Sequence, residues 1–340
     1  MKSALAKLIT GAHLTEEEAE NAMTALAEGG VPPAQIGAFL AALRVKGETV
    51  GEITGFARAL RQKSVLVQTS RRPLLDTCGT GGDSVKTFNI STTAAFVASA
   101  CGVAVAKHGN RAVTSKCGSA DVLESLGVRL VEDAVAVGRC IDRIGIGFLF
   151  ARAHHPAMRH AASVRAELGF RTVFNALGPL TNPAGATRQL LGVYDPALCE
   201  PLARVLGNLG AERAMVVHGG DGRGGLDEIA TWGETVVAEW DGAAVNTYTV
   251  TPEMLGVPVC DPADLRAGCD PGENAAILRG ILSGADTGAR RDIVAANAGA
   301  ALYVAGVAES VRDGVRTALQ ALASGAGHAK LEELITETNR

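Results

Sequence analysis

The stretch DTCGTGGDSVKTFNIST, residues 76–92, places a glycine-rich loop between a strand-like run and a helical pattern that begins near Ser91. Glycine costs backbone entropy, so the glycines at 79, 81 and 82 indicate that another group approaches this backbone closely. In open α/β sheets, ligands bind at the carboxyl ends of strands, where the free N–H groups and the dipole of the next helix favour phosphate. The stretch therefore predicts an anion site at a strand end, the alternative being a tight turn with an ordinary helix cap.

Strand-like and helical patterns alternate along most of the chain after residue 74, which is typical of a mostly parallel central sheet flanked by helices. The residues before this point favour helices, with capping boxes at Thr15–Glu18 and Thr49–Glu52. We therefore expect an α/β fold with two parts. These are a small all-helical domain at residues 1–72, joined by a helical interlude at about 165–190, and a larger α/β domain at 73–340.

Composition excludes several functional classes. A formal net charge of -4 over 340 residues argues against a general nucleic-acid or anionic-membrane binder. Seven cysteines without a CxxC pair indicate neither a disulfide framework nor a zinc site. The chain has no apolar leader and no run long enough to span a bilayer, so we expect a cytoplasmic protein without a membrane partner.

A second loop, KHGNRAVTSKCGS at residues 107–119, follows the apolar run CGVAVA and should also lie at the carboxyl end of a strand. Lys107, His108, Arg111 and Lys116 give it positive charge. Lysine as a point charge and arginine as a fork suit a phosphate or pyrophosphate ligand. A solvated basic loop is the alternative.

A third feature is HGGDGRGGLDE, in which Asp227 and Glu228 follow a glycine-rich strand end. Adjacent carboxylates suit Mg²⁺, which usually takes one or two carboxylates plus substrate phosphates, although such a pair can also simply be solvated. GDGRGG at 220–225 matches the G-x-G-x-x-G dinucleotide pattern, but the helix that should hold the pyrophosphate does not follow it. We therefore do not expect a dinucleotide site.

The helical segment HHPAMRHAASVRAELG, residues 154–169, carries Arg165, which either contacts a ligand or pairs with a nearby acid. We interpret the histidines at 154, 155 and 160 as structural, because their spacing does not place them on one helical face. No nucleophile triad or strong general base is evident. Phosphate loops with a magnesium pair then suit positioning and charge stabilisation, as in displacement of pyrophosphate at an anomeric carbon.

Several long motifs, in order, resemble the anthranilate phosphoribosyltransferase family nearly from end to end: GTGGD with TFNIST, KHGNR with SKCGSADVLESLG, the segment at 154–183, and VHGGDGRGGLDEI. The resemblance implies transfer of a phosphoribosyl group from phosphoribosyl pyrophosphate (PRPP) to anthranilate in tryptophan biosynthesis. It also implies two Mg²⁺ ions, a PRPP-binding α/β domain and a homodimer joined through the helical domain.

The family's functional residues carry over onto matching positions. Those implied to contact PRPP are Gly79, Gly82, Asp83, Thr87, Asn89, Ser91, Thr92, Lys107, His108, Gly109, Asn110, Arg111, Ala112, Val113, Thr114, Ser115 and Ser119. Those implied to contact anthranilate are Gly79, Asn110 and Arg165, and those implied to hold magnesium are Ser91, Asp227 and Glu228. No residue is implied as acid, base or nucleophile.

The chain departs from the family where Arg223, Gly224 and Gly225 stand between Gly222 and Leu226, which lengthens the arm before the acidic pair. Two rival classes remain, a pyrimidine nucleoside phosphorylase and a non-catalytic nucleic-acid-binding relative. The Arg165 segment and KHGNR argue against the first class. The acidic charge and the retained acidic pair argue against the second.

Overall fold

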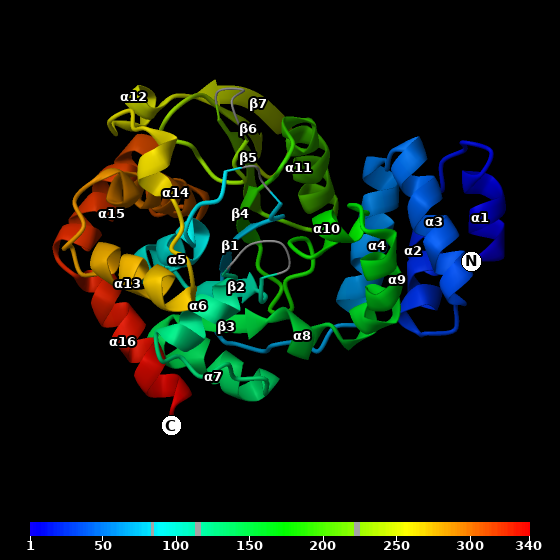
Figure 1. Cartoon of the computed structure of the whole chain (residues 1–340), viewed down its shortest axis with the longest axis horizontal. Helices are drawn as coiled ribbons and strands as arrows, with labels where there is room; N and C mark the ends of the chain where they lie inside the picture. Colours follow the sequence, from blue (N-terminus) through cyan, green and yellow to red (C-terminus); the bar gives the residue numbers. More distant parts are fainter. Residues whose placement is uncertain (83–84, 113–116, 221–224) are drawn as a thin grey trace.

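The computed structural model describes residues 1–82, 85–112, 117–220 and 225–340. Four helices begin the chain: α1 Lys2–Leu8, α2 Glu16–Ala27, α3 Pro33–Lys46 and α4 Val50–Gln62. Both expected capping boxes are confirmed, since the Thr15 and Thr49 side chains accept the N–H groups of Glu18 and Glu52. These helices form a lobe at one end of the molecule (Figure 1).

A buried ion pair fixes the entry to α4. Glu52 accepts a hydrogen bond from Lys46 Nζ at 2.8 Å and from the Leu14 N–H at 2.9 Å. The side chain of Lys46 is only 5% exposed and that of Glu52 is fully buried. Because the pair also receives backbone hydrogen bonds, its desolvation is compensated, and the pair ties the loop before α2 to α4.

The larger body is built on one seven-stranded sheet with the order β3-β2-β1-β4-β5-β6-β7. Strands β1 to β5 are parallel, and β6 and β7 are antiparallel. The expected mostly parallel sheet is thus confirmed. The strands are β1 Leu75–Gly79, β2 Val105–Gly109, β3 Ile146–Phe150, β4 Arg188–Gly192, β5 Arg213–Gly219, β6 Thr235–Trp240 and β7 Val245–Val250.

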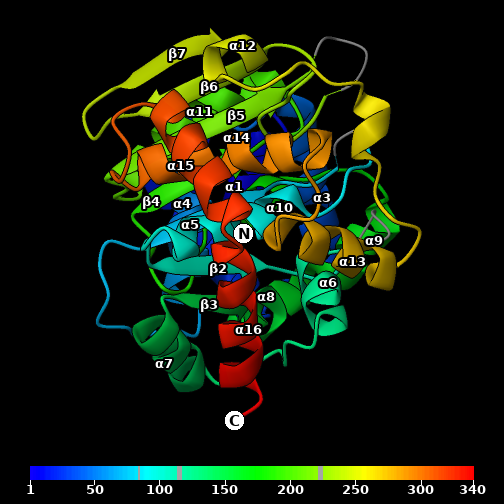
Figure 2. The same cartoon turned by 90° about the vertical axis from the view of Figure 1, so that its left-hand side faces the viewer.

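Helices lie on both sides of the sheet in Figure 1, and Figure 2 looks onto the side that the C-terminal helices cover. The long helices are α5 Ile90–Ala100, α7 Ala134–Ile144, α11 Cys199–Asn208, α13 Pro271–Leu282, α14 Ala289–Val304, α15 Val311–Ala323 and α16 Ala326–Thr338. The short ones are α6 Ser119–Ser125, α8 Ala151–His154, α9 Ala162–Leu168, α10 Phe174–Leu177, α12 Pro252–Leu255 and the 3-10 turns Pro156–Ala161, Pro196–Leu198 and Pro262–Leu265. Every helix in the described ranges is too short or too polar to cross a bilayer.

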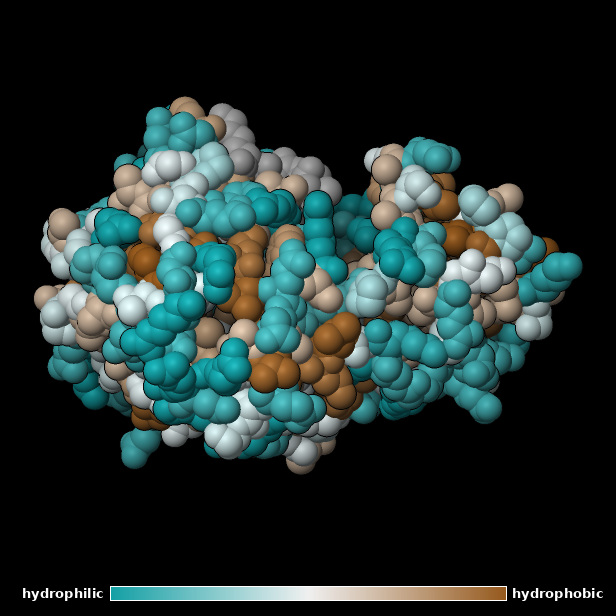
Figure 3. Space-filling view, turned by 90° about the horizontal axis from the view of Figure 1, so that it is seen from below, coloured by the Kyte–Doolittle hydropathy of each residue, from teal (hydrophilic) through white to brown (hydrophobic). Residues whose placement is uncertain are grey.

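The helical lobe shares its apolar core with the large body. One buried cluster contains Leu26 and Phe56 of the lobe, Val164 and Phe174 of the interlude, and Val216 of the sheet. Helix α9 accordingly lies beside the lobe (Figure 1), and the surface narrows between lobe and body in Figure 3. The domain boundary at residue 72 stays a prediction, because this apolar cluster contains residues from both sides of that position.

Strand β1 sits at the switch point of the sheet. The chain passes from β1 to β2 and β3 on one side, and then returns to β4 and β5 on the other. Where the connections that follow two adjacent parallel strands run toward opposite edges of the sheet, a crevice opens at the carboxyl ends of those two strands. The crevice therefore lies beside Gly79 and Gly192, the last residues of β1 and β4.

Candidate active site

A cavity of about 1310 Å³ occupies this end of the sheet. The sequence-predicted residues that line it are Gly79, Gly82, Thr87, Asn89, Ser91, Thr92, Lys107, His108, Gly109, Asn110, Arg111, Ala112, Ser119, Arg165, Asp227 and Glu228. The predictions at Asp83, Val113, Thr114 and Ser115 fall outside the described residues, as do Arg223 and Gly224 of the longer arm. Segments far apart in the sequence thus meet in one cavity, and their individual ligand contacts stay predictions.

The glycine loop is fixed to the end of β4. Its Thr80 N–H donates to the Gly192 carbonyl at 2.9 Å, and the Tyr194 N–H donates to Thr80 Oγ1 at 3.1 Å. Gly81 and Gly82 have φ values of +66° and +79°, which glycine adopts without strain. The loop therefore has a defined shape that only its glycines allow.

The acidic pair lies directly over the switch point. A Cβ atom on Gly79 would come within 2.2 Å of Asp227 Oδ2, and one on Gly192 within 1.5 Å of the Asp227 carbonyl oxygen. The sequence explained the glycine at 79 by the approach of a substrate, whereas the structure places Asp227 against it. Sequence reasoning did not identify Gly192, because nothing in the pattern around it marks this contact.

Both carboxylates accept backbone N–H groups of the two predicted anion-binding elements. Asp227 Oδ2 accepts the Gly81 N–H at 2.7 Å, and Glu228 Oε1 accepts the Ser91 N–H in the first turn of α5 at 2.9 Å. Burial raises the pKa of Asp227. Burial and the neighbouring Asp227 raise the pKa of Glu228 to about 8. The pair thus combines a buried carboxylate at Glu228 with a half-buried one at Asp227, each beside a backbone donor.

Lys107 supplies the nearby positive charge. Its ammonium group donates to the Thr77 carbonyl and, at 3.3 Å, to Ser91 Oγ. Its charge lowers the pKa of both acidic residues, but burial outweighs this effect. Lys107 is only 4% exposed, so it acts as a fixed charge between the end of β1 and the start of α5.

The side chain of Asp76 interrupts the backbone pairing between β1 and β2. It is fully buried, and its carboxylate accepts the His108 N–H at 3.0 Å and the Asn182 side-chain amide at 2.8 Å. Because Asp76 takes the His108 N–H, the backbone of β1 pairs with β2 only at Leu75 and Val105. Burial lowers the pKa of His108, whose Nε2 has no hydrogen-bond partner among the described residues. A neutral imidazole therefore lines the cavity.

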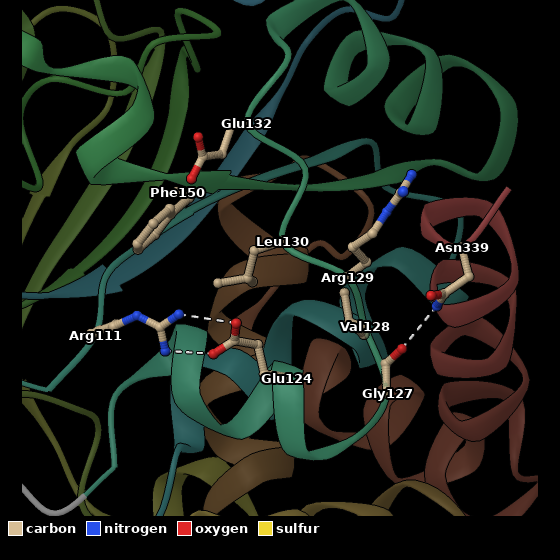
Figure 4. Close-up of a pocket in the computed structure, with 9 residues that line it drawn as sticks. All are labelled: Arg111, Glu124, Gly127, Val128, Arg129, Leu130, Glu132, Phe150 and Asn339. Carbon is tan, nitrogen blue, oxygen red and sulfur yellow. Dashed lines mark hydrogen bonds and ion pairs between the residues drawn. The ribbon is translucent and has the colours of Figure 1, made fainter.

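Asp121 holds the two ends of the basic loop together. Its Oδ2 accepts the N–H groups of Ala112 and Gly118, each at 2.9 Å, and its Oδ1 accepts Arg111 Nη1 at 3.0 Å. Glu124 binds the same guanidinium on the side of a second, smaller cavity (Figure 4). Sequence reasoning treated Arg111 as a fork for an anion. In the structure its guanidinium is already paired with the carboxylates of Asp121 and Glu124. Sequence reasoning did not identify Asp121.

Two arginines of the interlude face the main cavity. Arg165 lies 5.0 Å from the centre of the Phe174 ring, and burial lowers the pKa of its guanidinium. No acid pairs with Arg165 in the described ranges, so the alternative of a nearby acidic partner is not observed there. Arg171 donates to the Gly82 carbonyl and stacks 4.0 Å from the Tyr194 ring centre. Sequence reasoning missed Arg171, and its only signal was a basic residue just beyond α9.

The chemistry of this cavity is that of positioning and charge. It brings together cations at Lys107, Arg165 and Arg171 and two carboxylates, with no cluster of three or more His, Cys, Asp or Glu suited to a metal in the described part of the chain. A pair of carboxylates is nevertheless the protein share of many Mg²⁺ sites, whose other ligands are phosphate and water. The arrangement suits a polyphosphate substrate together with a smaller anion.

Two family models match the chain. The helical bundle domain of a glycosyl transferase family matches residues 2–64, and the a/b domain of that family matches residues 71–328.

The chain is similar to named relatives and to solved structures over almost its whole length. An anthranilate phosphoribosyltransferase of Rubrobacter xylanophilus is 54% identical and covers 100% of this chain and 98% of the relative. The crystal structure of the Thermus thermophilus anthranilate phosphoribosyltransferase has a TM-score of 0.94 and 48% identity, with 99% of each chain covered. The Saccharomyces cerevisiae enzyme in complex with PRPP and Mg has a TM-score of 0.89 and 29% identity, covering 99% of this chain and 97% of that one. The same yeast enzyme has also been solved with 4-fluoroanthranilate, at a TM-score of 0.87 and 28% identity, with the same coverage. The chain therefore belongs to the anthranilate phosphoribosyltransferase family.

Proposed function

We propose that this protein transfers the phosphoribosyl group of PRPP to the amine of anthranilate, giving N-(5-phosphoribosyl)anthranilate and pyrophosphate. The observation that carries the proposal is the single cavity in which the glycine loop, Lys107, the acidic pair and Arg165 meet. The yeast relative solved with PRPP and Mg, and with 4-fluoroanthranilate, supports the same pair of substrates.

The acidic pair fits a magnesium site. Glu228 is buried and the adjacent Asp227 is half-buried, and the pKa of each is raised by removal from solvent. Asp227, Glu228 and Ser91 would hold Mg²⁺, with two ions as the expected number. When bound, Mg²⁺ withdraws negative charge from the leaving pyrophosphate.

The protein's own residues supply orientation. Lys107 and the donors of the glycine loop hold the pyrophosphate, and the Arg165 fork binds the carboxylate of anthranilate. The amine of anthranilate is neutral, so it attacks the anomeric carbon without a strong base, in keeping with a cavity that offers none. Catalysis then rests on alignment of the two substrates and on fixed positive charge near the leaving group.

We also propose a homodimer joined through the helical lobe, in a cytoplasmic enzyme. Val45 of α3 is 89% exposed, and Ile9, the residue that follows α1, is 73% exposed. Two such apolar side chains on neighbouring helices suit a partner surface. Light scattering of the wild type and of Val45→Glu tests this point, and a wild type that is monomeric would contradict the dimer.

The function is tested by following anthranilate fluorescence with PRPP and Mg²⁺, and by mass spectrometry of the product. We expect loss of anthranilate signal and a product carrying one phosphoribosyl group. Thymidine with phosphate is the parallel reaction for the rival class. Cleavage of thymidine without consumption of anthranilate would replace the proposal with a nucleoside phosphorylase.

A further inference from the structure

A fully buried asparagine lies in the apolar run AANAGAALYV, residues 295–304, of helix α14. Burial of a side-chain amide costs free energy unless its hydrogen bonds are made. Asn297 makes three: its Oδ1 accepts the Ile229 N–H at 2.9 Å, and its Nδ2 donates to the carbonyls of Ile229 at 3.0 Å and of Ile293 at 2.9 Å. Asn297 thus binds both backbone groups of Ile229, the residue that follows Glu228, across 68 positions of the chain.

The acidic pair therefore lies between two anchors. Leu226, before the pair, exchanges two backbone hydrogen bonds with Gly219 at the end of β5, at 2.8 and 3.0 Å. Ile229, after the pair, is held by the amide of Asn297. The first anchor is made by the backbone of the sheet, whereas the second is made by one side chain of a helix. A single substitution can therefore remove the second anchor and leave the first.

The second anchor fixes the peptide unit between Glu228 and Ile229. The N–H that Asn297 binds belongs to this unit, and because a peptide unit is planar, its orientation limits the direction in which the Glu228 side chain leaves the backbone. In the structure that side chain reaches α5, where its Oε1 accepts the Ser91 N–H at 2.9 Å. Ile229 is fully buried, so without the amide its N–H and carbonyl would lose partners that water cannot easily replace.

We propose that Asn297 is a positioning residue of the metal site: its amide orients the Glu228 carboxylate and thereby sets the affinity of the protein for a metal-bound diphosphate. The inference rests on the proposed function, in which Asp227, Glu228 and Ser91 hold Mg²⁺. Asn297 is not among the described residues that line the cavity, so it acts through the backbone of Ile229 and not by touching a ligand. Groups that orient a metal ligand in this way commonly change metal affinity tenfold or more.

The test is calorimetric titration of inorganic pyrophosphate into the full chain, once with saturating Mg²⁺ and once with excess EDTA. Asn297→Leu removes the three hydrogen bonds and keeps nearly the same volume, whereas Asn297→Ala removes them and leaves a void. The two variants should differ in stability but share the same loss of affinity, because only the hydrogen bonds are lost from both. Thermal melting confirms folding of each, and either variant alone suffices.

The matched control is Thr338→Val, on α16. The hydroxyl of Thr338 is also buried and also accepts the N–H of a distant residue, Arg129, at 3.3 Å. Neither Thr338 nor Arg129 is among the described residues that line the main cavity. The control therefore removes the same kind of contact from a place where it cannot orient the acidic pair.

With Mg²⁺ we expect both Asn297 variants to bind pyrophosphate about tenfold more weakly or worse than the wild type and Thr338→Val. In EDTA all four proteins should bind it alike, because the loss concerns the metal. The electron paramagnetic resonance spectrum of bound Mn²⁺-pyrophosphate should also differ between the wild type and the Asn297 variants, since it reports the arrangement of the ligands around the metal.

A folded Asn297 variant that gains as much affinity from Mg²⁺ as the wild type does would overturn the inference. An equal loss in EDTA and in Mg²⁺, or an equal loss in Thr338→Val, would also overturn it, since a general loosening of the protein would then be the cause. These outcomes leave the proposed function standing. A wild type that does not consume anthranilate with PRPP and Mg²⁺ would instead overturn the proposed function.

Discussion

Gly192 lies so close to Asp227 that a Cβ atom on it would come within 1.5 Å of the Asp227 carbonyl oxygen. This contact joins the end of β4 to the arm that carries the acidic pair. It also places that pair over the crevice between β1 and β4, where the strand order reverses. The position of the acidic pair is thus set by the sheet and by the absence of a side chain at residue 192.

Replacing Gly192 with alanine should displace the acidic pair. We expect a loss of about 1–3 kcal/mol in the free energy of unfolding, as for overpacked sites, together with an increased Mg²⁺ requirement for activity. Denaturant unfolding and activity against Mg²⁺ concentration measure the two effects. The control is Gly51→Ala in α4, where an added Cβ has no neighbour within 4 Å. A Gly192→Ala enzyme with an unchanged Mg²⁺ dependence would contradict the described contact.

Removing Asp121 should loosen the basic loop and weaken the use of PRPP. In Asp121→Ala the N–H groups of Ala112 and Gly118 lose their common acceptor, so we expect the KM for PRPP to rise about tenfold with little change in the KM for anthranilate. Asp121→Asn keeps an acceptor for both N–H groups and should lie between this variant and the wild type.

Glu124→Gln is the control for the Asp121 series, because it disturbs the ion pair with Arg111 but leaves the two backbone hydrogen bonds intact. Steady-state kinetics with each substrate varied in turn gives the comparison. If Glu124→Gln raised the KM for PRPP as much as Asp121→Ala, the ion pair rather than the backbone contacts would be the cause.

Truncating Arg165 should affect one substrate more than the other. Its guanidinium has no acidic partner among the described residues and lies within the cavity, so we expect Arg165→Ala to raise the KM for anthranilate about tenfold or more and that for PRPP far less. Arg159→Ala, an exposed change in the preceding turn, should alter neither value. An equal effect of Arg165→Ala on both substrates would count against its role as the carboxylate contact.

The Lys46–Glu52 pair predicts a pH dependence of stability. Burial alone would raise the pKa of Glu52, but the hydrogen bonds from Lys46 and from the N–H groups of Leu14 and Thr49 lower it overall. A carboxyl whose pKa is lowered on folding stabilises the protein above its unfolded value of about 4.3, and this contribution is lost as the pH falls through the folded value.

The variant Glu52→Gln should therefore be less stable than the wild type by about 3 kcal/mol at neutral pH, because Lys46 stays buried without its partner. The difference should shrink as the pH falls from the unfolded value of about 4.3 through the lowered pKa of folded Glu52, below which the wild-type carboxyl is protonated as well. Urea unfolding of both proteins across this range measures it. A difference that did not change with pH would show that packing, and not the charge of Glu52, is responsible.

Much of the fold follows from local patterns. The capping boxes at Thr15 and Thr49 and the alternation after residue 74 depend on neighbours in the chain, and the structure confirms each. The strand order was not predictable in the same way. It depends on which edges pair across long separations, such as β1 with β4, and no pattern within either strand specifies its partner.

The candidate site shows the same limit. Its loops were predicted because glycine, lysine and adjacent acids are unusual at strand ends. The contacts between loops were not predicted: Asp227 lies 146 positions from Gly81, and Asp121 stands in an ordinary helical pattern. The prediction that Arg111 serves as an anion-binding fork used only its charge. The sequence indicates a basic side chain there, but not that two carboxylates bind it.

The most direct test of the assembled site is a crystal structure of the protein with Mg²⁺, PRPP and 4-fluoroanthranilate. We expect metal density beside Asp227, Glu228 and Ser91, the diphosphate against Lys107 and the glycine loop, and the carboxylate of the aromatic acid on Arg165. Metal bound away from the acidic pair, or the aromatic carboxylate bound away from Arg165, would contradict the arrangement described here.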